Sequence, residues 1–175
     1  MADPAPRRRF PRGRETGEGA YLVVIGLGSN EEGPARIDAA VEEISYEYDL
    51  LARSTRYVSP PDEAGEPVAE GTDRAGYSNA AVLIRTTQDY DTLKATLRAI
   101  EERLGRDRTD AGVVAIDLDI LLLQDQIVRK GERVLAPHPD LESKRYAAIP
   151  SAEVAPFLRH AITEESLADL AARLA

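Results

Sequence analysis

The chain has 175 residues, of which 43% are apolar and 30% charged, and its formal net charge is −9. This length and composition predict one globular domain with a substantial core. Because cysteine is absent, disulfides, thiolate metal sites and a cysteine nucleophile are excluded, which fits a reducing, cytoplasmic setting. No run of about 18 apolar residues is present, so we expect no membrane-spanning segment.

The charge is unevenly distributed along the chain. Residues 1–14 hold five arginines and one aspartate, a formal charge of +4, which leaves −13 on the remainder. We expect residues 1–19, rich in Arg, Pro and Gly, to form a disordered arm and residues 20–175 to form a single domain. The arm lacks the apolar stretch of a secretory signal. An acidic domain with two Phe and no Trp argues against nucleic-acid binding.

The first half of the domain predicts a strand, a helix and a second strand. The apolar residues 21–25 are expected to form a strand that ends in a turn at residues 26–30. Pro34, followed by apolar residues at helical spacing, predicts a helix. A second strand is expected over residues 49–58. Residues 62–76, rich in Gly, Pro, Glu and Asp, predict a long loop of a kind that is often functional.

The second half repeats this order. We expect a strand over residues 80–86, a helix from about Tyr90 that ends at Gly105, and a buried strand over residues 113–123. Residues 134–137 are expected to extend the sheet, and residues 164–174 to form a short terminal helix. The order strand, helix, strand, strand, helix, strand predicts an α+β, ferredoxin-like (βαββαβ) fold. Both helices would pack on one face of an antiparallel sheet, leaving the other face or its rim free for a ligand.

Two carboxylates interrupt the apolar strand expected over residues 113–123. Side chains alternate along a strand, so Asp117 and Asp119 point the same way, about 7 Å apart. Burying such a pair is costly unless a cation meets it, and Mg²⁺ carrying a polyphosphate would do so. The alternative is an edge strand whose polar face meets water. The pair alone does not decide between these interpretations.

Four other motifs each allow a binding role and a structural one. The Gly-Leu-Gly-Ser-Asn segment at residues 26–30 lacks the third glycine of a dinucleotide loop and the lysine of a P-loop. The Tyr77-Ser78-Asn79 segment contains residues that stack on and hydrogen-bond to flat heterocycles, and that are also common in turns. Arg106 and Arg108 suit phosphate binding or a solvated loop. His138 lies between two prolines that stiffen its backbone, which suits either a positioned ligand contact or a structural role.

In combination, these motifs resemble the 6-hydroxymethyl-7,8-dihydropterin pyrophosphokinase family over roughly residues 20–157. The resemblance rests on the segments at residues 28–30, 59–61, 77–82, 100–108, 116–121, 137–139 and 150–156, in the order expected for the family. It implies a ferredoxin-like fold. It also implies transfer of diphosphate from ATP, the co-substrate, to the hydroxymethyl group of the pterin, giving AMP and the dihydropterin diphosphate in folate biosynthesis. The partners implied are small molecules, and no protein partner follows from the sequence.

The resemblance also assigns roles to residues. Asp117 and Asp119 would hold two Mg²⁺ ions and, with Arg106, form the catalytic set. The pterin would be bound by Ser59, Pro60, Tyr77, Asn79 and Tyr146. ATP would be bound by Glu101, Arg106, Arg108, Ile120, Arg133 and His138.

The chain departs from the family at the phosphate-binding segment. Family members usually carry a Gly-Pro-Arg-Thr segment before the paired aspartates, and here Val114 stands in place of the arginine. Lys144 replaces a second family arginine and cannot form its bidentate contact. If catalysis persists, another cation should reach the space of the missing arginine, and Arg129, Lys130, Lys144 and Arg145 are the candidates.

Two alternatives to an active pyrophosphokinase follow. The loss of the arginine at Val114 motivates a catalytically impaired paralogue that acts as a pterin- or nucleotide-binding module. A nucleotidyltransferase is suggested by Gly28-Ser29 after a strand and a later Asp-x-Asp. That family separates the two motifs by about a dozen residues, whereas nearly 90 intervene here, so it ranks last.

Overall fold

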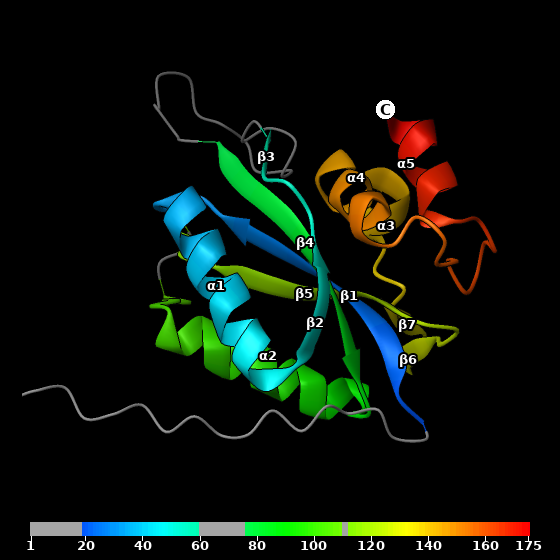
Figure 1. The fold of residues 1–175 in the computed structure, drawn as a ribbon, viewed down its shortest axis with the longest axis horizontal. Coiled ribbons are helices and arrows are strands. Elements are labelled where there is room, and N and C mark those ends of the chain that lie inside the picture. The colour runs from blue at the N-terminus through cyan, green and yellow to red at the C-terminus, as the bar shows by residue number, and fades with distance from the viewer. Residues whose placement is uncertain (1–18, 60–75, 110–111) are drawn as a thin grey trace, which may run out of the picture.

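The computed structural model describes residues 19–59, 76–109 and 112–175. Its main sheet is antiparallel, with the strand order β2-β4-β1-β5, and β3 pairs with the far end of β4 (Figure 1). The strands are β1 (Tyr21–Ser29), β2 (Asp49–Arg53), β3 (Tyr57–Ser59), β4 (Tyr77–Thr86) and β5 (Asp117–Leu123). The helices between them are α1 (Gly33–Glu47) and α2 (Tyr90–Arg103). The expected ferredoxin-like α+β fold is confirmed.

One face of the sheet is covered by α1 and α2, as expected. Apolar residues at alternate positions of β1, β4 and β5 pack against Ile37 and Ile44 of α1 and against Leu93, Leu97 and Ile100 of α2. Pro34 lies in the first turn of α1, and Asp89 caps α2 by accepting a hydrogen bond from Thr92 N. Gly105 follows α2 with a φ of 86°, a left-handed conformation that favours glycine.

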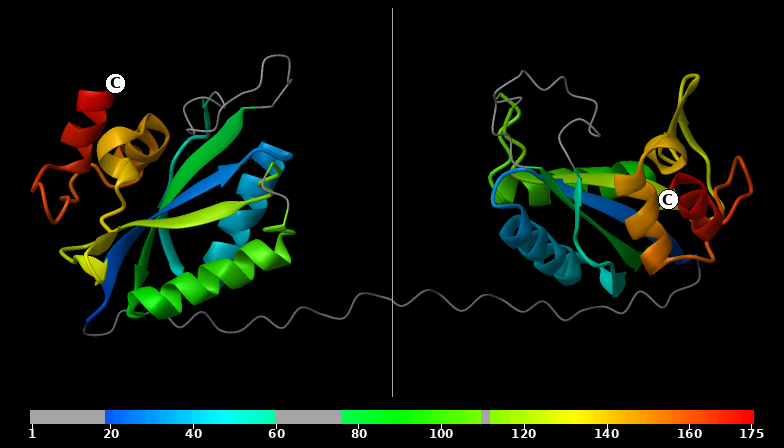
Figure 2. Two further views of the ribbon diagram at one scale, coloured as in Figure 1. Left: turned by 180° about the vertical axis from the view of Figure 1, so that it is seen from behind. Right: turned by 90° about the horizontal axis from the view of Figure 1, so that it is seen from above.

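The opposite face is only partly free, which corrects one expectation. Beyond β5 the chain forms a separate hairpin, β6 (Val128–Lys130) and β7 (Arg133–Ala136), so residues 134–137 do not extend the main sheet. It continues into α3 (Asp140–Ser143), α4 (Arg145–Val154) and α5 (Leu167–Leu174). These three helices gather on the side away from α1 and α2 (Figure 2). They pack through residues such as Leu141, Val154 and Leu170 on Val24 and Leu83 of the sheet.

Four strand boundaries differ from those expected, and hydrogen bonds between distant residues explain two of them. The strand expected over residues 80–86 begins earlier, at Tyr77. The strand expected over residues 49–58 divides into β2 and β3, because Ser54 Oγ accepts the backbone hydrogen bond of Ala81 N at 2.9 Å. Residues 113–116 lie before β5, and Val114 is tied to Asn30 by two hydrogen bonds, N to Oδ1 (2.7 Å) and O from N (3.0 Å). The first strand continues through residues 26–29 instead of turning there.

The terminal helix also begins later than expected. It starts at Leu167, because Ser166 Oγ accepts the hydrogen bond of Asp169 N at 3.1 Å and caps the helix, and Glu164 has a φ of 62°. Within the described residues, no helix is both long and apolar enough to cross a membrane. The expected arm, residues 1–19, lies almost wholly outside the described part of the chain.

Candidate active site

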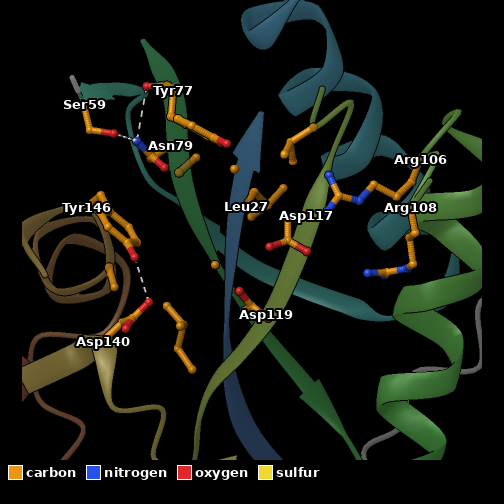
Figure 3. Close-up of a pocket in the computed structure, with 16 residues that line it drawn as sticks. Leu27, Ser59, Tyr77, Asn79, Arg106, Arg108, Asp117, Asp119, Asp140 and Tyr146 are labelled. Carbon is orange, nitrogen blue, oxygen red and sulfur yellow. Dashed lines mark hydrogen bonds between the residues drawn. The ribbon is translucent and has the colours of Figure 1, made fainter. Parts of the chain in front are cut away.

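A cavity of about 480 Å³ lies on the partly free face, between the sheet and α4 (Figure 3). Eight of the residues expected at the site line it: Ser59, Tyr77, Asn79, Arg106, Arg108, Asp117, Asp119 and Tyr146. They come from β3, β4, β5, α4 and the loop after α2. Segments up to about 90 residues apart in the sequence therefore share one space.

The two aspartates lie at the start of β5, and glycines lie opposite both of them. Asp117 pairs with Gly28 and Asp119 with Gly26 on the neighbouring strand β1. A Cβ at Gly26 would come within 2.9 Å of the Leu121 side chain, so a larger residue here would require that side chain to move. Since neither glycine has a side chain, the space beside both carboxylates stays open to the cavity.

The two carboxylates disfavour each other's charge. Burial raises the pKa of Asp119, and the neighbouring Asp117 raises it further, whereas Lys94 and His138 oppose this shift. Lys94 Nζ lies 3.4 Å from Asp119 Oδ1. A cation placed between the aspartates would relieve this repulsion. Among the described residues, no group of three or more His, Cys, Asp and Glu side chains is placed so that it could hold a metal ion.

The arginines lie at one end of the cavity (Figure 3). Arg106 has two buried guanidinium nitrogens, Nε and Nη1, that find no hydrogen-bond partner among the described residues. Arg108 pairs through Nη2 with the buried carboxylate of Glu101. Buried donors without partners are rare in folded proteins, so Arg106 is suited to receive an anionic group.

Tyr77, Asn79, Ser59 and Tyr146 lie at the other end (Figure 3). Asn79 Nδ2 donates to Ser59 Oγ at 2.8 Å and to the Tyr77 carbonyl oxygen at 3.2 Å. These bonds use both amide hydrogens, which leaves Oδ1 to accept a hydrogen bond from a ligand. The sequence offered Asn79 as donor and acceptor together; in the structure its donors bind the protein.

Asp140 is a lining residue that the sequence analysis missed. Its Oδ2 accepts a hydrogen bond from the Tyr146 hydroxyl at 2.8 Å, which fixes that ring at the cavity wall. Burial, then Asp140, raises the pKa of Tyr146, so the hydroxyl stays protonated. Its place two residues after His138 was the signal that could have identified it.

Four expected ATP-binding residues do not line the cavity. Glu101 is buried beside the outer edge of β5 and accepts a hydrogen bond from Leu118 N at 2.7 Å. Ile120 belongs to the core on the α1 and α2 face, and Arg133 is exposed on the β6–β7 hairpin. His138 Nδ1 accepts a hydrogen bond from Asp140 N at 3.2 Å. Pro60 lies outside the described residues.

None of the four candidates for replacing the missing arginine lines the larger cavity. Arg145 instead lines a smaller one, of about 220 Å³, together with Ser59, Asn79 and Tyr146. Val114 does line the larger cavity, so the substitution falls at the site itself. The arginines found there are Arg106 and Arg108.

Comparison with known proteins agrees with this arrangement. Residues 24–156 match the family model for 7,8-dihydro-6-hydroxymethylpterin-pyrophosphokinase. The 2-amino-4-hydroxy-6-hydroxymethyldihydropteridine pyrophosphokinase of Methylorubrum extorquens is 35% identical over 79% of this chain and 84% of that protein. The protein of the same name from Haemophilus influenzae is 33% identical over 75% of this chain and 79% of its own length.

Solved structures show the same fold at lower identity. A Plasmodium falciparum HPPK-DHPS triple mutant superposes with a TM-score of 0.66 over 91% of this chain, at 12% identity. The chain spans 45% of that longer protein. On the family match and the bacterial relatives, the chain belongs to the 7,8-dihydro-6-hydroxymethylpterin-pyrophosphokinase family.

Proposed function

We propose that this protein transfers diphosphate from ATP to the hydroxymethyl group of 6-hydroxymethyl-7,8-dihydropterin, giving AMP and the dihydropterin diphosphate in folate biosynthesis. One observation carries the proposal: a single cavity has two tyrosines and an amide at one end, two arginines at the other, and Asp117 and Asp119 between them. The end with the tyrosines and the amide suits a flat heterocycle, and the end with the arginines suits a polyphosphate. The bacterial relatives are named as pyrophosphokinases, which supports catalysis over a binding-only module.

The end of the cavity with Tyr77, Tyr146 and Asn79 would bind the pterin by stacking and hydrogen bonding. The rings of Tyr77 and Tyr146 provide flat apolar surfaces, and Asn79 Oδ1 accepts an N–H of the heterocycle. The bonds from Asn79 to Ser59 and from Tyr146 to Asp140 hold these groups before the ligand arrives. The protein therefore needs little reorganisation to orient the hydroxymethyl oxygen.

The end of the cavity with Arg106 and Arg108 would bind the phosphates of ATP through charge. The unpartnered nitrogens of Arg106 would contact phosphate oxygens, and Arg108 would contribute a second positive charge. Asp117 and Asp119 offer hard carboxylate oxygens, a donor set that fits two Mg²⁺ ions completed by phosphate oxygens and water. Bound there, Mg²⁺ would neutralise phosphate charge and polarise the phosphorus under attack.

The reaction then requires mainly alignment. The hydroxymethyl oxygen attacks the β-phosphorus, the bond from this phosphorus to the α–β bridging oxygen breaks, and AMP leaves as the hydroxyl proton is lost. The chain contributes by holding the two substrates in one line within the shared cavity. A cytoplasmic location accompanies this function as a prediction.

The test is an assay with ATP, MgCl₂ and 6-hydroxymethyl-7,8-dihydropterin. We expect AMP to form only when pterin and Mg²⁺ are both present. Asp117→Asn should reduce this rate at least 100-fold without lowering the thermal midpoint, because it removes charge from an open, half-buried position. Absence of AMP above a no-protein control, with pterin binding retained, would refute the proposal in favour of a binding module.

A further inference from the structure

The outer edge of β5 is covered by side chains of α2 rather than by another strand. β5 is the last strand of the main sheet, so backbone groups on its outer side have no partner strand. Leu118 is such a residue. Its N–H donates to Glu101 Oε1 at 2.7 Å, and its carbonyl oxygen accepts from Lys94 Nζ at 3.2 Å.

Lys94 and Glu101 reach this edge from the same face of α2. They are seven residues apart, which is two helical turns. Glu101 is fully buried, whereas one quarter of the Lys94 side chain is exposed. The ammonium is therefore held at the rim of the sheet, next to the site described above.

From this position Lys94 also meets the carboxylate pair. Its Nζ lies 3.4 Å from Asp119 Oδ1, and Asp119 shares the cavity with Asp117. Besides Asp117, the other titratable groups that interact electrostatically with Asp119 are His138, Tyr90 and Tyr146. Among the described residues, Lys94 supplies the ammonium that forms an ion pair with Asp119. Its charge compensates one of the two negative charges in the absence of any metal.

We propose that Lys94 is a resident counter-cation that weakens binding of a free divalent metal at Asp117 and Asp119, so that the metal is held firmly only together with nucleotide phosphates. The inference rests on the function proposed above and goes beyond it. A dication at the carboxylates would lie near the ammonium, and the two would repel each other. Phosphate oxygens bring negative charge that offsets this repulsion.

The size of the effect follows from Coulomb's law. A unit charge about 6 Å from a dication in a medium with the dielectric constant of water changes affinity by roughly tenfold. Salt reduces this figure. Removing the charge of Lys94 should therefore tighten metal binding by about 3- to 10-fold. A residue that only orients Asp119 would have the opposite effect, because its removal would weaken binding.

The experiment is a titration of the nucleotide-free protein with Mn²⁺ at pH 8, with free Mn²⁺ measured by electron paramagnetic resonance. We expect Lys94→Met to bind Mn²⁺ about 3- to 10-fold more tightly than the wild type, and Lys94→Arg, which keeps the charge, to stay within twofold. Arg98→Met is the matched control, since it removes a cation one turn further along α2. It should also stay within twofold, and thermal melting checks that each variant folds.

Two results separate failure of this inference from failure of the proposed function. If Asp117→Asn weakens Mn²⁺ binding but Lys94→Met leaves it unchanged or weaker, the role of Lys94 is refuted and the metal site stands. If Asp117→Asn binds Mn²⁺ as well as the wild type does, the carboxylates are not the metal site. The counter-cation role and the metal arrangement of the proposed function then both fail.

Discussion

Glu101 Oε1 accepts the backbone hydrogen bond of Leu118 at 2.7 Å, and Leu118 is the residue between the two aspartates of the cavity. The other carboxylate oxygen of Glu101 pairs with Arg108, which lines the same cavity. One buried side chain thus joins the strand that carries the carboxylates to the loop that carries an arginine. Sequence resemblance predicts that Glu101 binds ATP, and its contacts in the structure are with Arg108 and with Leu118 of β5.

Truncating Glu101 should destabilise the fold. Glu101→Ala leaves the Leu118 N–H without its acceptor and removes the ion pair, so we expect a loss of about 2–3 kcal/mol in the free energy of unfolding. Urea denaturation at pH 7.5 measures it. Glu102→Ala, at the exposed neighbouring position, is the control and should cost less than about 0.5 kcal/mol. Equal effects of the two substitutions would contradict the assigned role.

Val114 permits a gain-of-function test. It lines the cavity and is 9% exposed, whereas Val113 is 38% exposed and does not line it. Placing a guanidinium at residue 114 adds a cation to the phosphate end, so Val114→Arg should raise the rate of AMP formation about tenfold. Steady-state kinetics with saturating pterin would show this. Val113→Arg should leave the rate unchanged, and an equal gain in both variants would indicate a general charge effect.

Tyr146 separates stacking from hydrogen bonding. Tyr146→Phe keeps the ring and loses only the bond to Asp140, so pterin affinity should change less than threefold. Tyr146→Ala removes the stacking surface and should weaken pterin binding by tenfold or more, by analogy with base stacking on aromatic residues. Quenching of pterin fluorescence reports both affinities. Tyr46→Ala, on the exposed surface of α1, is the control, and a large effect of Tyr146→Phe would argue against stacking.

The burial of His160 should make the stability of the fold depend on pH, independently of catalysis. Its side chain is 1% exposed, and burial lowers its pKa even though Glu142 and Glu165 oppose the shift. As the pH falls, His160 is therefore protonated in the unfolded chain before it is protonated in the folded chain. Stability is unaffected by this group above the unfolded-state pKa of about 6.5 and falls as the pH drops below it.

The corresponding measurement compares thermal unfolding at pH 7.5 and pH 5.5. His160→Gln should lose less stability between these values than the wild type, although it is less stable at pH 7.5. Identical pH profiles for the wild type and His160→Gln would show that burial of His160 does not set this dependence.

Much of the fold was predictable because it depends on local spacing. The apolar periodicity of residues 37–44 and 93–104 and the positions of Pro34 and Gly105 identified α1 and α2 correctly. The helices α3 and α4 were missed because they are short and α4 contains Pro150, which is atypical of a helix interior. The division of β2 from β3 depends on Ser54 meeting Ala81, a contact between distant residues that no local pattern encodes.

Part of the site was likewise predictable from the sequence, and part depends on tertiary packing. The types and order of the residues in the family motifs identified eight residues that line the cavity, because each motif combines side chains suited to one ligand group. The contacts of Glu101 with Leu118 and of Lys94 with Asp119 depend on how α2 packs along the edge of β5, and spacing alone does not reveal this. The roles of Glu101, Ile120, Arg133 and His138 in ATP binding stay predictions, as does the role of Pro60 in pterin binding.

The fate of the γ-phosphate of ATP shows directly whether the protein transfers diphosphate to the pterin. The protein is incubated with [γ-³²P]ATP, Mg²⁺ and 6-hydroxymethyl-7,8-dihydropterin, and the products are separated by chromatography. We expect the label to co-elute with the fluorescent pterin as its diphosphate, in a one-to-one ratio with AMP. Label recovered as inorganic phosphate, or left in ATP while pterin binds, would contradict it.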